Sequence, residues 1–465
     1  MKNLTEGKLG RSLLLFSIPA ILTAYLSQAY SLADTVIIGR FLGERCFAAS
    51  ASTSSLSAFL SSLFWGYGTG ASAYTARLFS EKNYTKLRRV VHINVFVCFV
   101  FSTLIGILAV LLRNPIFDLL NVEEEIRRDA AIYFAVIMLG AGMRDTGTMF
   151  SFMTASMGDS SFGFYLSLLS AVINVGGNLL SVTVLHWGIF GVAFFSILSV
   201  FIGLICYTLK YKKFFASTIP EKQEKEPFDF ADVRTVFSYS VACILQQASL
   251  FAVGLLIAPA VNKLGTSALA ARSIIGSISV YVSLCHLHSA RAVATHNAQC
   301  LGLCESAKQK LSRMRRALFT GILQSQMLGM VITIPILLFP NAITSIFLSG
   351  SESAESLRLA SMLLCVNTLT YILYCFSTVM HSFLRAVKAM WILYASTMFS
   401  SVANLVLSVL LISPLGLLGV YLAQGLAWAA EIVLLFFIYI SKVWIPQELR
   451  APAVQKSAEP VPAEG

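Results

Sequence analysis

Long apolar runs alternate with short polar segments along the whole chain. Most runs are long enough to cross a bilayer, since about 20 apolar residues span the hydrocarbon core as a helix. In lipid, every backbone polar group must be satisfied within the segment, so the runs are interpreted as helices. The pattern predicts about 12 membrane-spanning helices, near residues 13–38, 47–76, 90–112, 130–156, 162–184, 188–209, 235–259, 267–298, 317–338, 357–384, 389–412 and 416–440.

Composition supports the same class of protein. The chain is 57% hydrophobic and 12% charged, whereas a soluble protein carries about twice as much charge. We therefore expect an all-α polytopic membrane protein. The sequence contains no Walker A loop, no G-x-S-x-G and no H-E-x-x-H, so we expect no catalytic residues, no bound cofactor and no enzymatic activity.

Cysteine and histidine do not point to a metal centre or to disulfides. The nine cysteines lie mostly inside apolar runs without a spacing framework, which is typical of small packing residues. His286 and His288 invite a metal interpretation together with Cys285 and His296, but their i,i+2 spacing does not place them on one helical face. We therefore expect no metal site.

The net charge of +11 is concentrated in segments expected on one side of the membrane, and it forms no nucleic-acid-binding motif. With twelve spans, the two termini and the loops after even-numbered spans hold about 24 of the 34 Lys and Arg residues. This asymmetry predicts that both termini and these loops face the cytoplasm. The basic side is also expected to contact anionic lipid, and we expect no nucleic-acid partner.

The chain divides nearly in half at a charged segment, residues 217–234. Short stretches on its two sides resemble each other in order and at nearly one offset: 42–50 with 264–272, 75–86 with 297–308, and 188–192 with 416–420. That offset covers six helices, so matching helices run the same way through the membrane. Two parallel repeats of this kind face each other across a substrate cavity. The predicted layout is a six-helix lobe (1–216), a cytoplasmic linker (217–234), a second six-helix lobe (235–442) and a disordered cytoplasmic tail (443–465).

The first run contains one acid, Asp34, at the end of a polar stripe. Thr23, Ser27, Tyr30 and Asp34 recur at helical spacing and share one face of the helix. A carboxylate near the bilayer centre costs about 2.5 kcal/mol or more, whereas an interhelical hydrogen bond contributes only about 0.6 kcal/mol. Packing alone therefore does not explain Asp34. Burial disfavours the charged form of a carboxylate, so we expect Asp34 to be able to bind a proton near neutral pH.

The fifth run carries a matching stripe: Ser170, Asn174, Asn178 and Ser181. Two asparagines one turn apart can donate amide hydrogens to a carboxylate or coordinate a small cation. The stripe is also consistent with simple helix-to-helix packing, and the serines and threonines of both stripes are interpreted in that way.

Other polar features inside the runs have more than one interpretation. Pro19 removes a backbone hydrogen bond from the first helix and predicts a bend there, either static or movable. Arg144 and Asp145 lie mid-span and either pair with other helices or line the cavity; they need not pair with each other. Glu431 is expected to reach water, and Arg291 to extend towards a membrane face.

The chain resembles the MATE family, the multidrug and toxic compound extrusion transporters. This family belongs to the wider superfamily of multidrug, oligosaccharidyl-lipid and polysaccharide flippases. The resemblance covers about residues 5 to 442. It rests on "FSIPAIL" and "ADTVIIGRFLG" in the first run, then on "ASMGDS", "INVGGN" and "GIFGVAFFS", and in the second half on "VNKLGTSALAA", "AQCLG" and "LRAVK".

The resemblance implies two six-helix lobes and export of organic, often cationic and amphipathic, compounds across the plasma membrane. It implies coupling to entry of a proton or sodium ion at a site formed by Asp34, Asn174, Asn178 and Ser196, with Pro19 at a helix bend. Many members carry an aspartate where this chain has Asn178. The acids that some members carry in the second lobe are replaced here by Gln247 and Tyr374. The proton is therefore favoured over sodium.

The resemblance leaves one alternative function open, a lipid-linked precursor flippase of the same superfamily. Such flippases often need extra helices and a strongly cationic cavity.

In this chain, the substrate cavity is expected to be lined by Thr23, Ser27, Tyr30, Arg144 and Asp145. The expected partners are small organic substrates and membrane lipids, and the chain is expected to act as a monomer.

Overall fold

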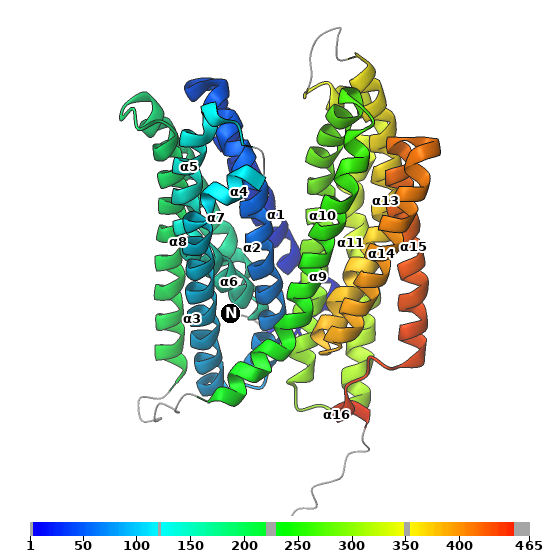
Figure 1. Cartoon of the computed structure of the whole chain (residues 1–465). Helices are drawn as coiled ribbons and strands as arrows, with labels where there is room; N and C mark the ends of the chain where they lie inside the picture. The colour runs from blue at the N-terminus through cyan, green and yellow to red at the C-terminus, as the bar shows by residue number, and fades with distance from the viewer. Residues whose placement is uncertain (1–2, 120–121, 220–228, 348–353, 451–465) are drawn as a thin grey trace, which may run out of the picture.

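A computed structural model describes residues 3–119, 122–219, 229–347 and 354–450, and these residues are helical apart from short connections (Figure 1). Ten stretches are long and apolar enough to cross a membrane, and one of them, Leu9–Ser80, contains two helices. A further span is formed by two 16-residue helices that meet at Gly140. The prediction of twelve spans in two lobes is thus confirmed.

The first lobe contains the elements α1 (Leu9–Ile37), the π-helical turn η1 (Ile38–Leu42), α2 (Gly43–Ser80), α3 (Tyr84–Leu111), the short α4 (Arg113–Leu119), α5 (Glu124–Leu139), α6 (Ala141–Ser156), α7 (Ser160–Thr183) and α8 (Gly188–Thr218). The second contains α9 (Phe230–Asn262), α10 (Thr266–Leu301), α11 (Ala307–Leu338), the short α12 (Pro340–Thr344), α13 (Ala354–Ala386), α14 (Met390–Leu415), α15 (Leu417–Ser441) and the short α16 (Gln447–Arg450).

Left-handed backbone positions recur in the two lobes at matching places. Gly43 at the start of α2 and Gly265 before α10 have φ of 85° and 93°. Gly188 at the start of α8 and Gly416 before α15 have φ of 60° and 58°. Glycine adopts this conformation without steric cost. The short sequence matches between the halves therefore include turns whose geometry requires the shared residue.

The two lobes are separated at one end of the molecule and meet at the other, where α2 crosses α9 (Figure 1). The helix backbones touch at this crossing. A Cβ added to Gly66 would lie 2.6 Å from the carbonyl oxygen of Cys243, and one added to Gly70 would lie 2.3 Å from that of Tyr239. The two glycines therefore permit the close approach that shuts this end.

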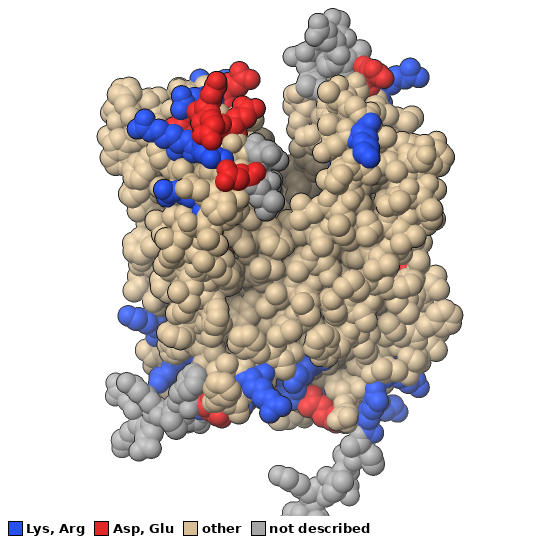
Figure 2. All heavy atoms as spheres, viewed as in Figure 1, with Lys and Arg blue, Asp and Glu red and all other residues tan. Residues whose placement is uncertain are grey.

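Ion pairs also join the lobes at the closed end. Arg77 Nη2 lies 2.9 Å from Glu448 Oε2, and Arg89 Nε lies 2.5 Å from Oδ2 of the buried Asp232. Figure 2 shows blue Lys and Arg side chains along this end, whereas a group of acidic residues covers part of the first lobe at the opposite end. The same view shows a hollow between the lobes at that opposite end.

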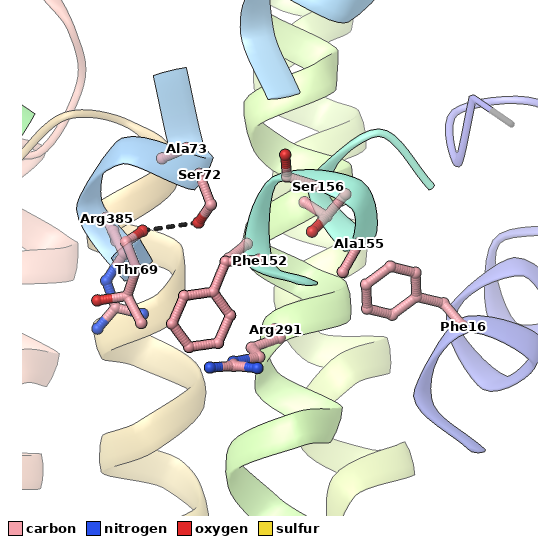
Figure 3. A pocket seen from close by; sticks show the side chains of 11 residues that line it. Phe16, Thr69, Ser72, Ala73, Phe152, Ala155, Ser156, Arg291 and Arg385 are labelled. Atoms are coloured by element: carbon pink, nitrogen blue, oxygen red, sulfur yellow. Dashed lines mark hydrogen bonds between the residues drawn. The ribbon is translucent and has the colours of Figure 1, made fainter. Parts of the chain in front are cut away.

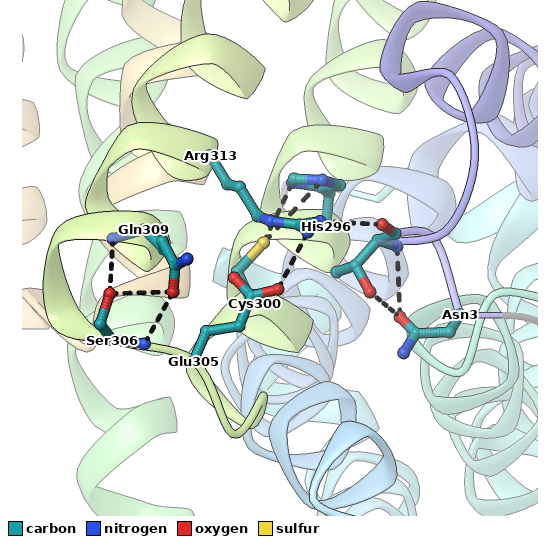
Figure 4. Close-up of polar contacts among 8 residues, drawn as sticks. Asn3, His296, Cys300, Glu305, Ser306, Gln309 and Arg313 are labelled. Atoms are coloured by element: carbon teal, nitrogen blue, oxygen red, sulfur yellow. Dashed lines mark hydrogen bonds and ion pairs between the residues drawn. The ribbon is translucent and has the colours of Figure 1, made fainter.

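The N-terminal segment is held by the second lobe at the closed end. Leu4 N donates to Gln299 Oε1 at 2.8 Å, and Arg313 Nη1 donates to the Thr5 carbonyl at 3.1 Å. Figure 4 shows Arg313 between this segment and Glu305, which it pairs with at 2.9 Å. The start of α1 is thereby tied to α10 and α11.

Two predicted boundaries change. Helix α8 reaches Thr218 and α9 begins at Phe230, so both helices extend into the predicted linker, whose residues 220–228 lie outside the described part of the chain.

The prediction of a disordered tail is wrong for residues 443–450. Trp444 is 1% exposed because its ring packs against Phe383, with 4.7 Å between ring centroids. Residues 451–465 lie outside the described residues.

Candidate functional site

Asp34 lies at a junction of three helices of the first lobe. Its Oδ1 accepts a hydrogen bond from Asn178 Nδ2 at 2.6 Å, and its Oδ2 accepts from Asn174 Nδ2 at 3.4 Å. Ser196 Oγ lies 3.3 Å from the same Oδ2, and Asn174 Nδ2 also donates to Ser196 Oγ at 3.0 Å. The structure therefore brings together all four residues that were expected to form the coupling site, from α1, α7 and α8.

Local sequence explains why these side chains meet. Asn174 and Asn178 are four residues apart on α7, so they project from one face of that helix. They are 1% and 0% exposed, whereas Asp34 is only partly buried. Directly after this part of α1 the chain forms the π-helical turn Ile38–Leu42. Such turns interrupt regular helices and are frequent at functional sites.

The hydrogen bonds show which form of Asp34 this arrangement suits. Both asparagines present amide hydrogens, which favour the ionised carboxylate. Ser196 has one hydroxyl proton, and its Oγ lies closer to the Val192 carbonyl oxygen (2.9 Å) than to Asp34. Asp34 is therefore held chiefly by the Asn178 amide at 2.6 Å, with a longer bond to Asn174.

Two acceptors are left over at this site. Asn174 Oδ1 and Asn178 Oδ1 are buried and have no hydrogen-bond partner among the described residues. Rotation of either amide would turn its oxygen towards Asp34, where it could accept from a protonated carboxyl group or bind a cation. The site can therefore serve a charged and a loaded form with small side-chain movements.

A cavity of about 250 Å³ lies one helical turn from the Asp34 cluster, since Tyr30, Ser170 and Val200 line it. Thr23, Ser27 and Tyr30 of α1 line it, together with Arg144 of α6. Asp145 lines a separate cavity of about 190 Å³ that also reaches Arg144. Tyr30 lies four residues before Asp34, on the same face of α1. The polar stripe of α1 thus runs from the large cavity to Asp34.

Arg144 and Asp145 contact each other, although their backbone positions are 100° apart on the helix. Arg144 Nε lies 3.1 Å from Asp145 Oδ1, and Asp145 is 5% exposed and also accepts from Ser102. The long arginine side chain spans the angular separation. The positive charge of Arg144 is therefore balanced by its neighbour.

Pro19 lies inside α1, which continues through it without a break. The Pro19 carbonyl accepts from Thr23 Oγ1 at 2.8 Å, and the Thr23 carbonyl accepts from Ser27 Oγ at 3.0 Å. The hydroxyls of Thr23 and Ser27 are thus bonded within their own helix. The bend at Pro19 stays a prediction.

Sequence reasoning missed two groups in the second lobe. Glu431 does not reach water: it is 1% exposed, accepts from Ser377 Oγ at 2.8 Å, and lies 3.0 Å from His381 Nε2. Arg291 does not extend to a membrane face, because its side chain lines the large cavity instead. For Glu431, the available signal is a second polar residue, His381, within another span. For Arg291, it is the position of the arginine inside its span, away from both helix ends.

Among His, Cys, Asp and Glu side chains of the described residues, no group of three is placed to hold a metal ion.

Comparisons with known proteins fit this geometry. The MatE family model matches residues 19–180 and 242–410. The probable multidrug resistance protein YoeA of Bacillus subtilis is 26% identical over 455 residues, which cover 94% of this chain and 95% of YoeA. The FAD transporter of Shewanella oneidensis is 28% identical over 155 residues, 31% of this chain and 34% of that protein. The solved structure of a MOP superfamily transporter from Pyrococcus furiosus, described as having a binding pocket of reverse polarity, superposes with a TM-score of 0.87 at 15% identity and covers 97% of this chain and 100% of that one.

Proposed function

The chain belongs to the MatE family, the multidrug and toxic compound extrusion transporters, and from this premise we propose that it is a secondary active antiporter. It exports amphipathic organic compounds across the plasma membrane in exchange for an entering cation. Asp34 is the coupling carboxylate. The names of two relatives support a transport role, since one is a probable multidrug resistance protein and the other a FAD transporter.

One observation carries the proposal: Asp34 is bound by two buried amides on α7, while the same face of α1 lines the neighbouring cavity. A change in the charge of Asp34 would alter its bonds to α7 and α8. Because α1 also carries Thr23, Ser27 and Tyr30, any resulting movement of α1 would reach the cavity. Ion loading and substrate binding would then be coupled through one helix.

The proton is the favoured coupling ion. A protonated Asp34 needs one acceptor, which either free asparagine oxygen can supply. A sodium ion prefers several hard oxygen ligands; Asn174, Asn178 and Ser196 could provide them only with both amides rotated. One charge moving through 100 mV supplies about 2.3 kcal/mol, enough for roughly a 50-fold gradient of a neutral substrate.

The proposed orientation places the basic, closed end in the cytoplasm, with both termini on that side. The hollow between the lobes would then face outwards (Figure 2). Export requires the opposite closure as well, in which α2 and α9 separate and the outer ends of the lobes meet.

The second candidate is a lipid-linked precursor flippase. The observation in its favour is the presence of Arg291 and Arg385 at cavities between the lobes, since anionic lipid headgroups need cationic partners.

The deciding experiment uses the full chain in proteoliposomes with an imposed pH gradient and no sodium. When the vesicle interior is acidic, protons leave the vesicles, and we expect a fluorescent amphipathic compound to accumulate inside. The Asp34→Asn variant should show no such accumulation. Transport driven only by sodium would overturn the proton assignment. Movement of a lipid-linked sugar phosphate without transport of any soluble compound would favour the flippase.

A further inference from the structure

Two cavities between the lobes meet at the side chains of Arg291 and Phe152, which line both of them. The larger is the cavity of about 250 Å³ described above, and the smaller has a volume of about 30 Å³ and is also lined by Arg385. No aspartate or glutamate of the described chain lines either cavity. The space in which a substrate would bind is therefore positively charged.

Arg291 and Arg385 differ from most arginines at the closed end because neither has a carboxylate partner within the described residues. Arg77, Arg89 and Arg313 each pair with an acid. Arg291 instead lies over aromatic rings, 4.0 Å from the centroid of Phe152 and 4.8 Å from that of Trp65. Its Nη2 is buried without a hydrogen bond.

Arg385 is 8% exposed, and its Nη2 donates to Gln246 Oε1 at 3.4 Å. Its Nε is buried and has no partner in the described structure. Figure 3 shows the guanidinium groups of Arg291 from α10 and Arg385 from α13 near the ring of Phe152. Two unbalanced positive charges thus face the same small space.

His288 adds a third unpartnered polar group. It lies three residues before Arg291, on the same face of α10, and lines the larger cavity. It is 5% exposed, and neither of its ring nitrogens has a hydrogen-bond partner among described residues.

Unbalanced buried cations are costly. An anion that enters the cavity would reduce this cost, and a guanidinium group binds carboxylate or phosphate through paired hydrogen bonds. Trp65 and Phe152 also line the larger cavity and supply apolar contact surface there. A cationic compound would find no acid here and would be repelled by both arginines.

We propose that the space formed by these two adjoining cavities binds an organic anion, with Arg291 and Arg385 as its anion-binding residues. The ligand would have an apolar, preferably aromatic, body and a phosphate or carboxylate group. This inference rests on the proposed transport function, because it names the substrate class of that function. It replaces the often cationic substrates that the family resemblance implies.

The test compares three probes that share one ring system: 1-naphthyl phosphate, neutral 1-naphthol and the cation 1-naphthylmethylammonium. Binding to the full-length protein in detergent is measured by calorimetry. We expect the phosphate to bind roughly tenfold or more tightly than the other two. Arg291→Gln and Arg385→Gln should each weaken binding of 1-naphthyl phosphate until it approaches that of 1-naphthol. Arg272→Gln, on α10 but outside both cavities, is the matched control and should bind all three like the wild type.

The unfolding temperature separates binding from a structural role. Because each arginine is unbalanced in the empty protein, Arg291→Gln and Arg385→Gln should unfold at the same or a higher temperature than the wild type. A fall in unfolding temperature with an unchanged phosphate preference would overturn the proposal. Preference for the cation, or equal binding of phosphate and naphthol, would also overturn it.

The anionic group could belong to a soluble compound or to a lipid headgroup, and a second arm distinguishes them. Dioleoyl phosphatidic acid is added as competitor, with dioleoylglycerol as its uncharged control. Displacement of 1-naphthyl phosphate by the phosphatidic acid alone would support the anion site and assign it to lipid. Lack of displacement would support the site and assign it to soluble anions.

Binding in detergent needs no ion gradient, so failure of coupled transport would leave this inference standing. Coupled transport of cations alone would refute it.

Discussion

Asn178 Nδ2 lies 2.6 Å from Asp34 Oδ1, although the two residues are 144 positions apart in the chain. The contact joins α1 to α7 through a carboxylate that is only partly buried and an amide that is fully buried. Hydrogen bonds to a charged group contribute about 1.5–3 kcal/mol. Loading of Asp34 with a proton would remove this charge, so the bond is the expected point at which ion binding changes the packing of α1.

The first prediction concerns Asp34 itself. Asp34→Asn cannot change charge, so the variant should be inserted normally and bind substrate but build no substrate gradient. Uptake into proteoliposomes under an imposed pH gradient measures this. Asp129→Asn, which removes an acid from the peripheral pair with Arg45, is the control and should transport like the wild type. Full gradient-driven transport by Asp34→Asn would exclude Asp34 from coupling.

The second prediction concerns the amide donors. Asn178→Leu removes a donor that favours the charged carboxylate, so the pH midpoint of transport should move upwards by about one to two units. Asn174→Leu should move it in the same direction by less, since its bond to Asp34 is longer, 3.4 Å against 2.6 Å. The readout is the initial transport rate across a pH series.

A control for the amides is available in the same lobe. Asn94→Leu replaces a fully buried amide on α3 whose side-chain oxygen accepts from Tyr67 at 2.9 Å. It should lower the unfolding temperature but leave the pH midpoint in place. If all three variants keep the wild-type midpoint, the asparagines only hold helices together.

Much of this architecture could be predicted from the sequence because lipid imposes simple rules. Apolar runs of spanning length indicate helices, and a polar stripe such as Thr23, Ser27, Tyr30 and Asp34 indicates a face turned away from lipid. The turn glycines Gly43 and Gly265 repeat because their backbone conformation requires them.

The rest depends on contacts between helices that are far apart in the chain. In the sequence, Arg385 stands next to a basic loop and is indistinguishable from the charges that predict topology, whereas packing of α13 at the inter-lobe contact buries it. Glu431 appears close to one end of its span, and only the position of α13 shows that His381 lies beside it. Trp444 follows the last span, and its burial depends on Phe383.

The third prediction concerns orientation. Single cysteines at Lys212, near the end of α8, or at Lys308, at the start of α11, should resist an impermeant thiol reagent in intact cells and react after permeabilisation, because this basic end of the lobes faces the cytoplasm in the proposed topology. Cysteines at Lys263, directly after α9, or at Arg358, near the start of α13, lie at the opposite end of the lobes and should react from outside. These variants are made in a chain whose nine native cysteines are replaced. Ready labelling at Lys212 or Lys308 from outside would contradict the proposed topology.

The fourth prediction concerns the glycine contact between α2 and α9. A Cβ at Gly70 would lie 2.3 Å from the Tyr239 carbonyl oxygen, and backbone cannot move aside as a flexible side chain can. Overpacking of this kind costs about 1–3 kcal/mol. Gly70→Ala should therefore destabilise the conformation described here relative to the one in which α2 and α9 separate, and shift the equilibrium between them by roughly tenfold.

The neighbouring Ser240 offers a direct readout of that separation. Its side chain is 0% exposed and donates to the Tyr67 carbonyl at 3.2 Å, so a cysteine at this position is protected while the crossing is closed. In the background without native cysteines, Ser240→Cys should react about tenfold faster with a small thiol reagent when Gly70→Ala is present. Gly254→Ala lies on α9, where an added Cβ meets no atom within 4 Å, and should leave the rate unchanged. Equal labelling rates in the two alanine variants, with equal unfolding temperatures, would show that the glycine contact does not control closure at this end.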